Sequence, residues 1–159
     1  MLRTARESFD IAVIEVSAYW DNAATVLGLV EADKRIVVTT HQLCHFQEDF
    51  NQWIGQVGAV VGLEPAQFSC IITQSDNSVL KVKDIAKETD TAVLGQIRHH
   101  SQASDYLNQG KLLELLRSPQ LQEDIEPIAK RIVKEFDWKC RPAVDTKPWI
   151  RRVMAAVSQ

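Results

Sequence analysis

The sequence has little cysteine, and the cysteines it has follow no pairing pattern. Cys44, Cys70 and Cys140 are widely spaced, and none of them belongs to a CxxC pair. This spacing argues against a disulfide framework and against a thiolate zinc site. The sequence therefore predicts reduced thiols, as in a cytoplasmic protein.

Long apolar runs are missing as well. No run of about 18 apolar residues occurs, and the first residues, MLRTARES, are polar where a secretory signal would carry its apolar core. We therefore expect a soluble, cytoplasmic protein with no transmembrane segment.

Positive charge is not in excess. The 159 residues carry 18 Lys and Arg against 21 Asp and Glu, a formal net charge of −3. Such a chain has no broad cationic field for a phosphate backbone, so we expect no direct nucleic-acid binding. With 45% apolar and 25% charged residues, the composition is that of a folded chain with one core.

The chain does contain short β-branched runs that alternate with longer amphipathic segments. These runs are FDIAVIEV (9–16), RIVVTT (35–40), FSCIITQ (68–74) and TAVLGQI (91–97). Nearly continuous Val and Ile is typical of strands covered on both faces, and intervening helices are typical of βα units. The sequence predicts an α/β fold with a mostly parallel four-strand sheet flanked by helices.

The best helix signal spans residues 42–61. Phe46, Phe50, Trp53 and Val57 fall on one stripe, and Gly62 follows as a stop signal. Gly110 likewise suits the end of a helix.

A final long helix is expected after Ser118 and Pro119, an N-cap followed by proline at the first helical position. Its apolar face runs from Leu121 to Phe136. Pro127 lies inside it, which predicts a kink or a break near Glu126.

Two points about the ends of the chain stay open. Residues 9–31 also fit one continuous helix, because apolar residues recur there at heptad spacing. The tail, 139–159, carries two prolines and a short amphipathic end, which predicts a short helix outside a domain at 1–138.

The order and spacing of these pieces resemble the second half of the ParA/MinD family of deviant-Walker ATPases, including relatives that localise pilus-assembly machinery. FDIAVIEV is similar to the family's acidic strand, EADKRIVVTTHQL and FSCIITQSD to the next two strands, DIAKETDTAVLGQI to the last parallel strand, and YLNQGKLLELL to the segment before the closing helix. The resemblance covers roughly residues 8–136. It implies a partial P-loop NTPase fold, with 1–138 as the C-terminal part of that domain.

The family's phosphate-binding loop has no counterpart in these residues. Such a loop binds phosphates through backbone N–H groups of a Gly-rich turn and through lysine. The chain has six glycines and no GKT or GKS. We expect no cofactor and no ATP hydrolysis for this chain alone, whereas the resemblance implies ATP and Mg²⁺ for the full-length family. It also implies that the strand carrying the P-loop would lie beside the strands present here, so that a sheet edge and an apolar face are uncovered.

The resemblance names four candidate cofactor-binding positions. Glu15 stands at the family's second acidic position, where a carboxylate acts on Mg²⁺ through water. Thr73 or Gln74 stands where relatives have an Asn that binds adenine; Gln74 keeps the amide group and Thr73 does not. Arg98 replaces the proline after the last strand. No catalytic residue is assigned.

His41 and His45 are four residues apart with Cys44 between them, a spacing that can place two imidazoles on one helical face. No third ligand accompanies them, so surface or capping histidines are expected and no metal site is predicted.

Two functional hypotheses follow. In the first, the chain is a truncated or degenerate form of an ATPase that positions pilus machinery, a plasmid or a septum, and whose full form dimerises with ATP. In the second, it is a complete, non-catalytic module that binds a protein partner or a second copy through the sheet edge or the C-terminal tail.

Overall fold

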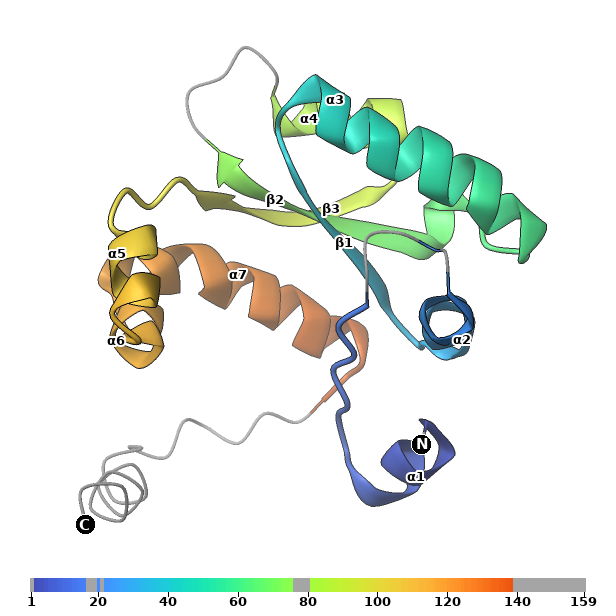
Figure 1. The fold of residues 1–159 in the computed structure, drawn as a ribbon, viewed down its shortest axis with the longest axis horizontal. Helices are drawn as coiled ribbons and strands as arrows, with labels where there is room; N and C mark the ends of the chain where they lie inside the picture. Colours follow the sequence, from blue (N-terminus) through green and yellow to red (C-terminus); the bar gives the residue numbers. More distant parts are fainter. Residues whose placement is uncertain (1, 17–19, 21, 76–80, 139–159) are drawn as a thin grey trace.

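Three of the four β-branched runs form one parallel sheet. The computed structural model describes residues 2–16, 20, 22–75 and 81–138 (Figure 1). The strands are β1 (Arg35–Thr40), β2 (Phe68–Ser75) and β3 (Ala92–Arg98), in the order β1-β2-β3. Both pairings are parallel.

Helices occupy most of the remaining chain. They are α1 (Leu2–Ser8), α2 (Ala23–Glu31), α3 (Leu43–Gln47), α4 (Val82–Thr89), α5 (Ala103–Asn108), α6 (Leu112–Leu116) and α7 (Pro119–Glu135). A π-helical stretch, η1 (Glu48–Gly58), continues α3, and a single 3₁₀ turn, η2 (Pro65–Gln67), precedes β2. The α3–η1 rod corresponds to the helix predicted at 42–61.

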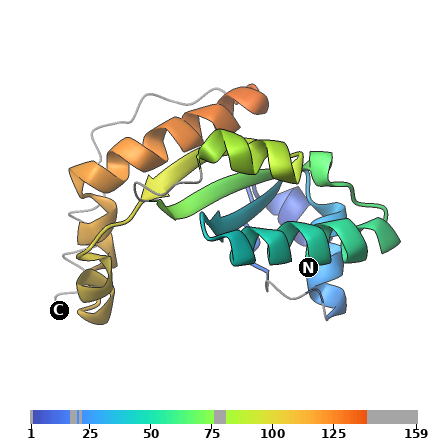
Figure 2. The ribbon, with the colours of Figure 1, turned by 90° about the horizontal axis from the view of Figure 1, so that it is seen from above.

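The main core lies between the sheet and the helices α3–η1 and α4. Phe68, Cys70 and Ile72 alternate along β2, so they point to the same face and are all buried. Phe50 of η1 and Ile85 of α4 complete the cluster. These helices therefore cover one face of the sheet, and α7 covers the opposite face (Figures 1 and 2).

Helix α7 packs on β3 at a glycine. A Cβ atom added to Gly95 would lie 2.5 Å from Cγ1 of the buried Ile128. Arg131 donates to the backbone carbonyls of Val93 and Leu94, at 3.2 and 2.6 Å. The absence of a side chain at Gly95 thus lets α7 approach the sheet closely.

The C-terminal end of α7 lies beside the start of β1. Lys34 Nζ is 2.7 Å from each carboxylate oxygen of Glu135. This ion pair joins residues far apart in the sequence and fixes α7 across the sheet.

The prediction of a fourth strand at Phe9–Val16 is wrong. Phe9 N–H still donates to the Ala5 carbonyl of α1, Asp10 is a bend, and residues 11–16 pair with no strand among the described residues, so the sheet has three strands rather than four. The single-helix alternative for 9–31 is also wrong, because α2 begins only at Ala23. An extended segment becomes a strand only when a neighbour accepts and donates its backbone hydrogen bonds.

The uncovered edge implied by the resemblance is present at β1. This strand pairs with β2 on one side and with no described residue on the other. Val38 is 61% exposed and Ile36 37% exposed. The apolar surface of β1 is therefore only partly covered.

Two helix-end predictions are confirmed and one predicted break is absent. Gly62 and Gly110 both adopt positive φ, 76° and 69°, where α3–η1 and α5 end. The predicted break near Glu126 is absent, because α7 runs through Pro127 as one helix; the alternative of a kink there stays a prediction. No helix in the described part of the chain combines the length and apolar character needed to cross a membrane. The predicted tail helix lies outside the described residues.

Candidate functional site

The carboxyl ends of the parallel strands bring three of the four candidate residues to one edge of the sheet. Thr73 and Gln74 are the two residues before the end of β2, and Arg98 is the last residue of β3. In open α/β sheets, ligands bind beyond this edge. Glu15 lies instead on the Phe9–Val16 segment, where it is exposed.

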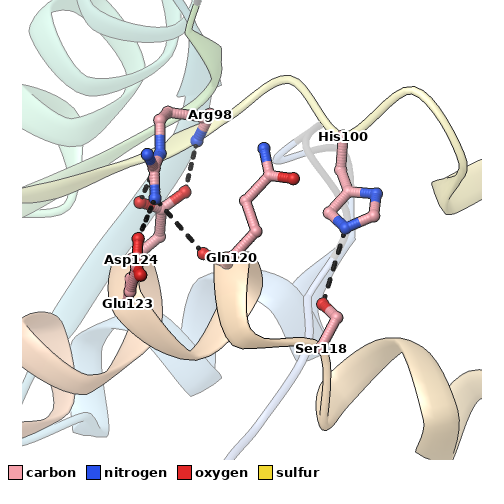
Figure 3. A network of polar contacts seen from close by, with 6 residues as sticks. All are labelled: Arg98, His100, Ser118, Gln120, Glu123 and Asp124. Atoms are coloured by element: carbon pink, nitrogen blue, oxygen red, sulfur yellow. Dashed lines mark hydrogen bonds and ion pairs between the residues drawn. The ribbon is translucent and has the colours of Figure 1, made fainter.

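Arg98 is engaged by the first turns of α7. Its Nε donates to Oδ1 of Asp124 at 2.8 Å, and its Nη2 donates to Oε2 of Glu123 at 3.0 Å (Figure 3). Its backbone N–H donates to Oδ2 of Asp124 at 2.9 Å. The hydrogen bonds that Arg98 donates to Glu123 and Asp124, together with the negative charges of these carboxylates, raise the pKa of Arg98. The guanidinium therefore faces two carboxylates rather than an open anion site.

Thr73 and Gln74 differ in what their side chains can reach. The half-buried Thr73 hydroxyl donates to the Thr39 carbonyl at 3.2 Å and so links β2 to β1. Gln74 is exposed and has φ of 52°, in the left-handed region, where the β2–β3 register shifts between Ile72 and Ser75. Of the two positions left open by the sequence, Gln74 is the one that presents an amide to solvent.

Two histidines at this edge contact hydroxyl groups. His45 Nδ1 lies 2.8 Å from Oγ1 of Thr40, and His100 Nε2 lies 3.5 Å from Oγ of Ser118, the N-cap of α7. Figure 3 places the His100–Ser118 pair beside the Arg98 network. Across the residues that the structure describes, no three His, Cys, Asp or Glu side chains gather as a metal site would require.

Sequence reasoning missed the partners of Arg98 and His100. Asp124 is 26 residues from Arg98 and Ser118 is 18 residues from His100, so no local pattern joins them. The available signal was the acidic pair Glu123 and Asp124 in the second turn of the predicted final helix.

The four candidate residues do not form a triphosphate site. Arg98 is the only cation among them, and its charge is compensated by Glu123 and Asp124. Glu15, Thr73 and Gln74 contribute a carboxylate, a hydroxyl and an amide, none of which neutralises phosphate charge. Phosphate binding needs N–H groups and ammonium charges that these residues do not supply.

Comparison with solved structures finds proteins of similar fold. The chain superposes on the MinD cell division protein of Aquifex aeolicus with a TM-score of 0.59, at 17% identity, over 76% of this chain and 50% of that one. The chain has a MinD-like fold. The MinC:MinD cell division protein complex of the same organism gives a TM-score of 0.57 at 18% identity, over 78% of this chain and 50% of that one.

The MinD-like chain spans about half the length of these structures. No protein-family model and no curated protein sequence matches it. At this level of identity, the likeness establishes the fold of the domain.

Proposed function

We propose that this chain corresponds to the C-terminal half of a cytoplasmic ParA/MinD-like positioning protein, as a fragment or degenerate form, and that these residues alone do not hydrolyse ATP. The proposal rests on the residues at the carboxyl ends of the strands, where open α/β sheets bind their ligands. The candidate cation there, Arg98, is held by two carboxylates, and the 159 residues contain no GKT or GKS.

The candidate residues fit a role in which nucleotide contact is weak or absent. Arg98 joins β3 to α7 and so contributes to the domain itself. Glu15 is exposed on a segment with no strand partner among the described residues, so no framework there aims its carboxylate at a metal ion. Only Gln74 offers an exposed amide of the type that could contact a base.

A second role, as a non-catalytic protein-binding module, is favoured by the exposed apolar edge of β1. Val38 and Ile36 are exposed on an outermost strand, and unpaired edges of this kind bind other strands. One of the similar structures is itself a complex of MinD with MinC. The cargo or partner, whether pilus machinery, a plasmid or a septum, would be engaged through protein contacts.

The test of the main proposal is phosphate release from Mg-ATP by the purified chain. We expect no release above the buffer blank, because the phosphates have no cationic cradle. Glu15→Gln and the control Glu88→Gln, an exposed change on α4, should leave this baseline unchanged. A saturable activity that disappears in Glu15→Gln and persists in Glu88→Gln would contradict the proposal.

A further inference from the structure

The open edge of β1 lacks the features that normally keep strand edges apart. Between Ile36 and Thr40 the strand has no charged residue and no proline. Natural sheets protect an edge with lysine, proline, a bulge or a covering element. Within the described residues, nothing pairs with this edge.

The chain also carries an unpaired strand-like segment. Phe9–Val16 is eight residues long, rich in β-branched residues and neither helix nor strand; Phe9 N–H still donates to the Ala5 carbonyl at the end of α1, and Val13 is 93% exposed. Phe9 and Ile11 are exposed as well. In Figure 1 the segment rises from α1 past the lower end of β1.

Contacts to α2 and its following loop hold this segment in place. Arg6, in the preceding helix α1, donates to the Glu31 carbonyl and pairs with Asp33 at 3.6 Å. At the other end, Val16 and Ile14 lie against Gly28 of α2. The segment is thus held beside α2, and within the described residues it does not pair with β1 of its own chain.

We propose that a second copy of this chain covers this surface, with Phe9–Val16 of each copy adding as a strand to the open β1 edge of the other. The donor and the acceptor are both present in one chain, so a two-fold exchange uses each of them once per copy and closes as a dimer. The eight-residue segment is long enough to pair with the six residues of β1.

The charges at the ends of the two strands are complementary. The donor segment carries Asp10 and Glu15 near its two ends, and the acceptor strand begins with Arg35; Lys34, just before it, is already paired with Glu135. In either strand direction, one donor carboxylate faces this basic end. Arg35 donates to the carbonyls of Leu29 and Val30, at 2.6 and 2.9 Å, and these neutral groups leave its positive charge in place. Opposite charges across a strand pair stabilise it.

This inference deepens the protein-binding role proposed above by naming the partner, and it does not depend on nucleotide. Finding ATP hydrolysis would therefore leave it intact, and finding a monomer would leave the absence of hydrolysis intact. The two proposals fail separately.

The test is sedimentation equilibrium of the full chain over a wide range of concentrations. We expect a reversible monomer–dimer equilibrium whose dissociation constant rises about tenfold or more in Val38→Lys and in Val13→Lys, because each variant places a charge in the paired strands. Val60→Lys is the matched control: Val60 is 85% exposed on the helix after η1, and its dissociation constant should not change.

Amide hydrogen exchange tests which residues form the dimer interface. Amides of β1 and of Phe9–Val16 should gain protection as the concentration rises in the wild type and in Val60→Lys, and should not gain it in Val13→Lys. Because Val13 is almost fully exposed, its replacement tests pairing even if Val38→Lys fails to fold. A chain that stays monomeric at all concentrations, or a dimer that survives both Val13→Lys and Val38→Lys, overturns the proposal.

Discussion

Replacing Gly95 with alanine places a methyl group where α7 meets the sheet. The new Cβ would lie 2.5 Å from Cγ1 of Ile128, about 1 Å inside an ordinary carbon contact of roughly 3.5 to 4.0 Å. Ile128 is buried, so either its rotamer or the position of α7 must change. Overpacking of this kind costs about 1 to 3 kcal/mol. Alanine also lowers the conformational entropy of the unfolded chain relative to glycine, but this offsets only about 0.4 to 1 kcal/mol of the cost.

The cost should disappear when the clashing atoms are removed. Ile128→Ala alone should cost about 2 to 5 kcal/mol by opening a cavity. In the double variant the alanine methyl at 95 enters that space, so the two costs should not add, and the coupling should be about 1 to 3 kcal/mol. The assay is urea denaturation followed by circular dichroism, with free energies of unfolding from linear extrapolation.

Gly62→Ala is the matched control. An added Cβ at Gly62 meets no atom within 4 Å, but its φ of 76° is unfavourable for alanine and should cost about 1 to 2 kcal/mol. That cost should add to the cost of Ile128→Ala. If Gly95→Ala is neutral, or if its cost adds fully to that of Ile128→Ala, α7 does not pack on β3 at this glycine.

Two further changes test the core and the surface electrostatics. Phe50→Ala should lower the free energy of unfolding by about 3 to 5 kcal/mol, because Phe50 is buried in the main cluster, whereas Val60→Ala should change it by about 0.5 kcal/mol or less in the same urea assay. A hydrogen bond from Lys130, at 2.6 Å, lowers the pKa of Glu126, so the contribution of this pair is present at neutral pH and is lost as the pH falls through that lowered pKa. Glu126→Gln should flatten this part of the acid dependence of the unfolding free energy, and an unchanged pH profile would contradict the assignment.

The strands that the sequence predicts correctly are those whose partners lie within the chain. RIVVTT coincides with β1, and the runs at 68–74 and 91–97 correspond to β2 and β3 within a residue. Phe9–Val16 has the same composition, but it has no pairing partner among the described residues. Amino-acid composition predicts only the β-propensity of a segment. Whether the segment joins a sheet depends on a neighbouring strand whose backbone groups can hydrogen-bond to it.

Pro127 shows a second limit of local reasoning. Proline removes one N–H donor from the helix and leaves the carbonyl four residues earlier without its usual partner. Pro127 and Glu123 both lie on the exposed side of α7, where water can satisfy that carbonyl. The helix therefore continues, although the same residue facing the sheet would have left a buried unpaired group.

The position of the candidate site in the fold could be predicted from the sequence, but the contacts between its side chains could not. The strand ends follow from the periodicity, so Thr73, Gln74 and Arg98 were expected at one edge. The pairing of Arg98 with Glu123 and Asp124 depends on how α7 crosses the sheet, which no short-range pattern specifies. The assignment of Glu15, Thr73, Gln74 and Arg98 to nucleotide contact stays a prediction.

Calorimetric titration of the full chain with Mg-ATP tests the central claim most directly, because it asks whether the ligand edge of this MinD-like sheet binds a triphosphate at all. With Arg98 held by Glu123 and Asp124 and no Gly-rich phosphate loop in the sequence, we predict no saturable heat of binding. Saturable, one-to-one binding that is lost in Glu15→Gln and retained in Glu88→Gln would contradict the account.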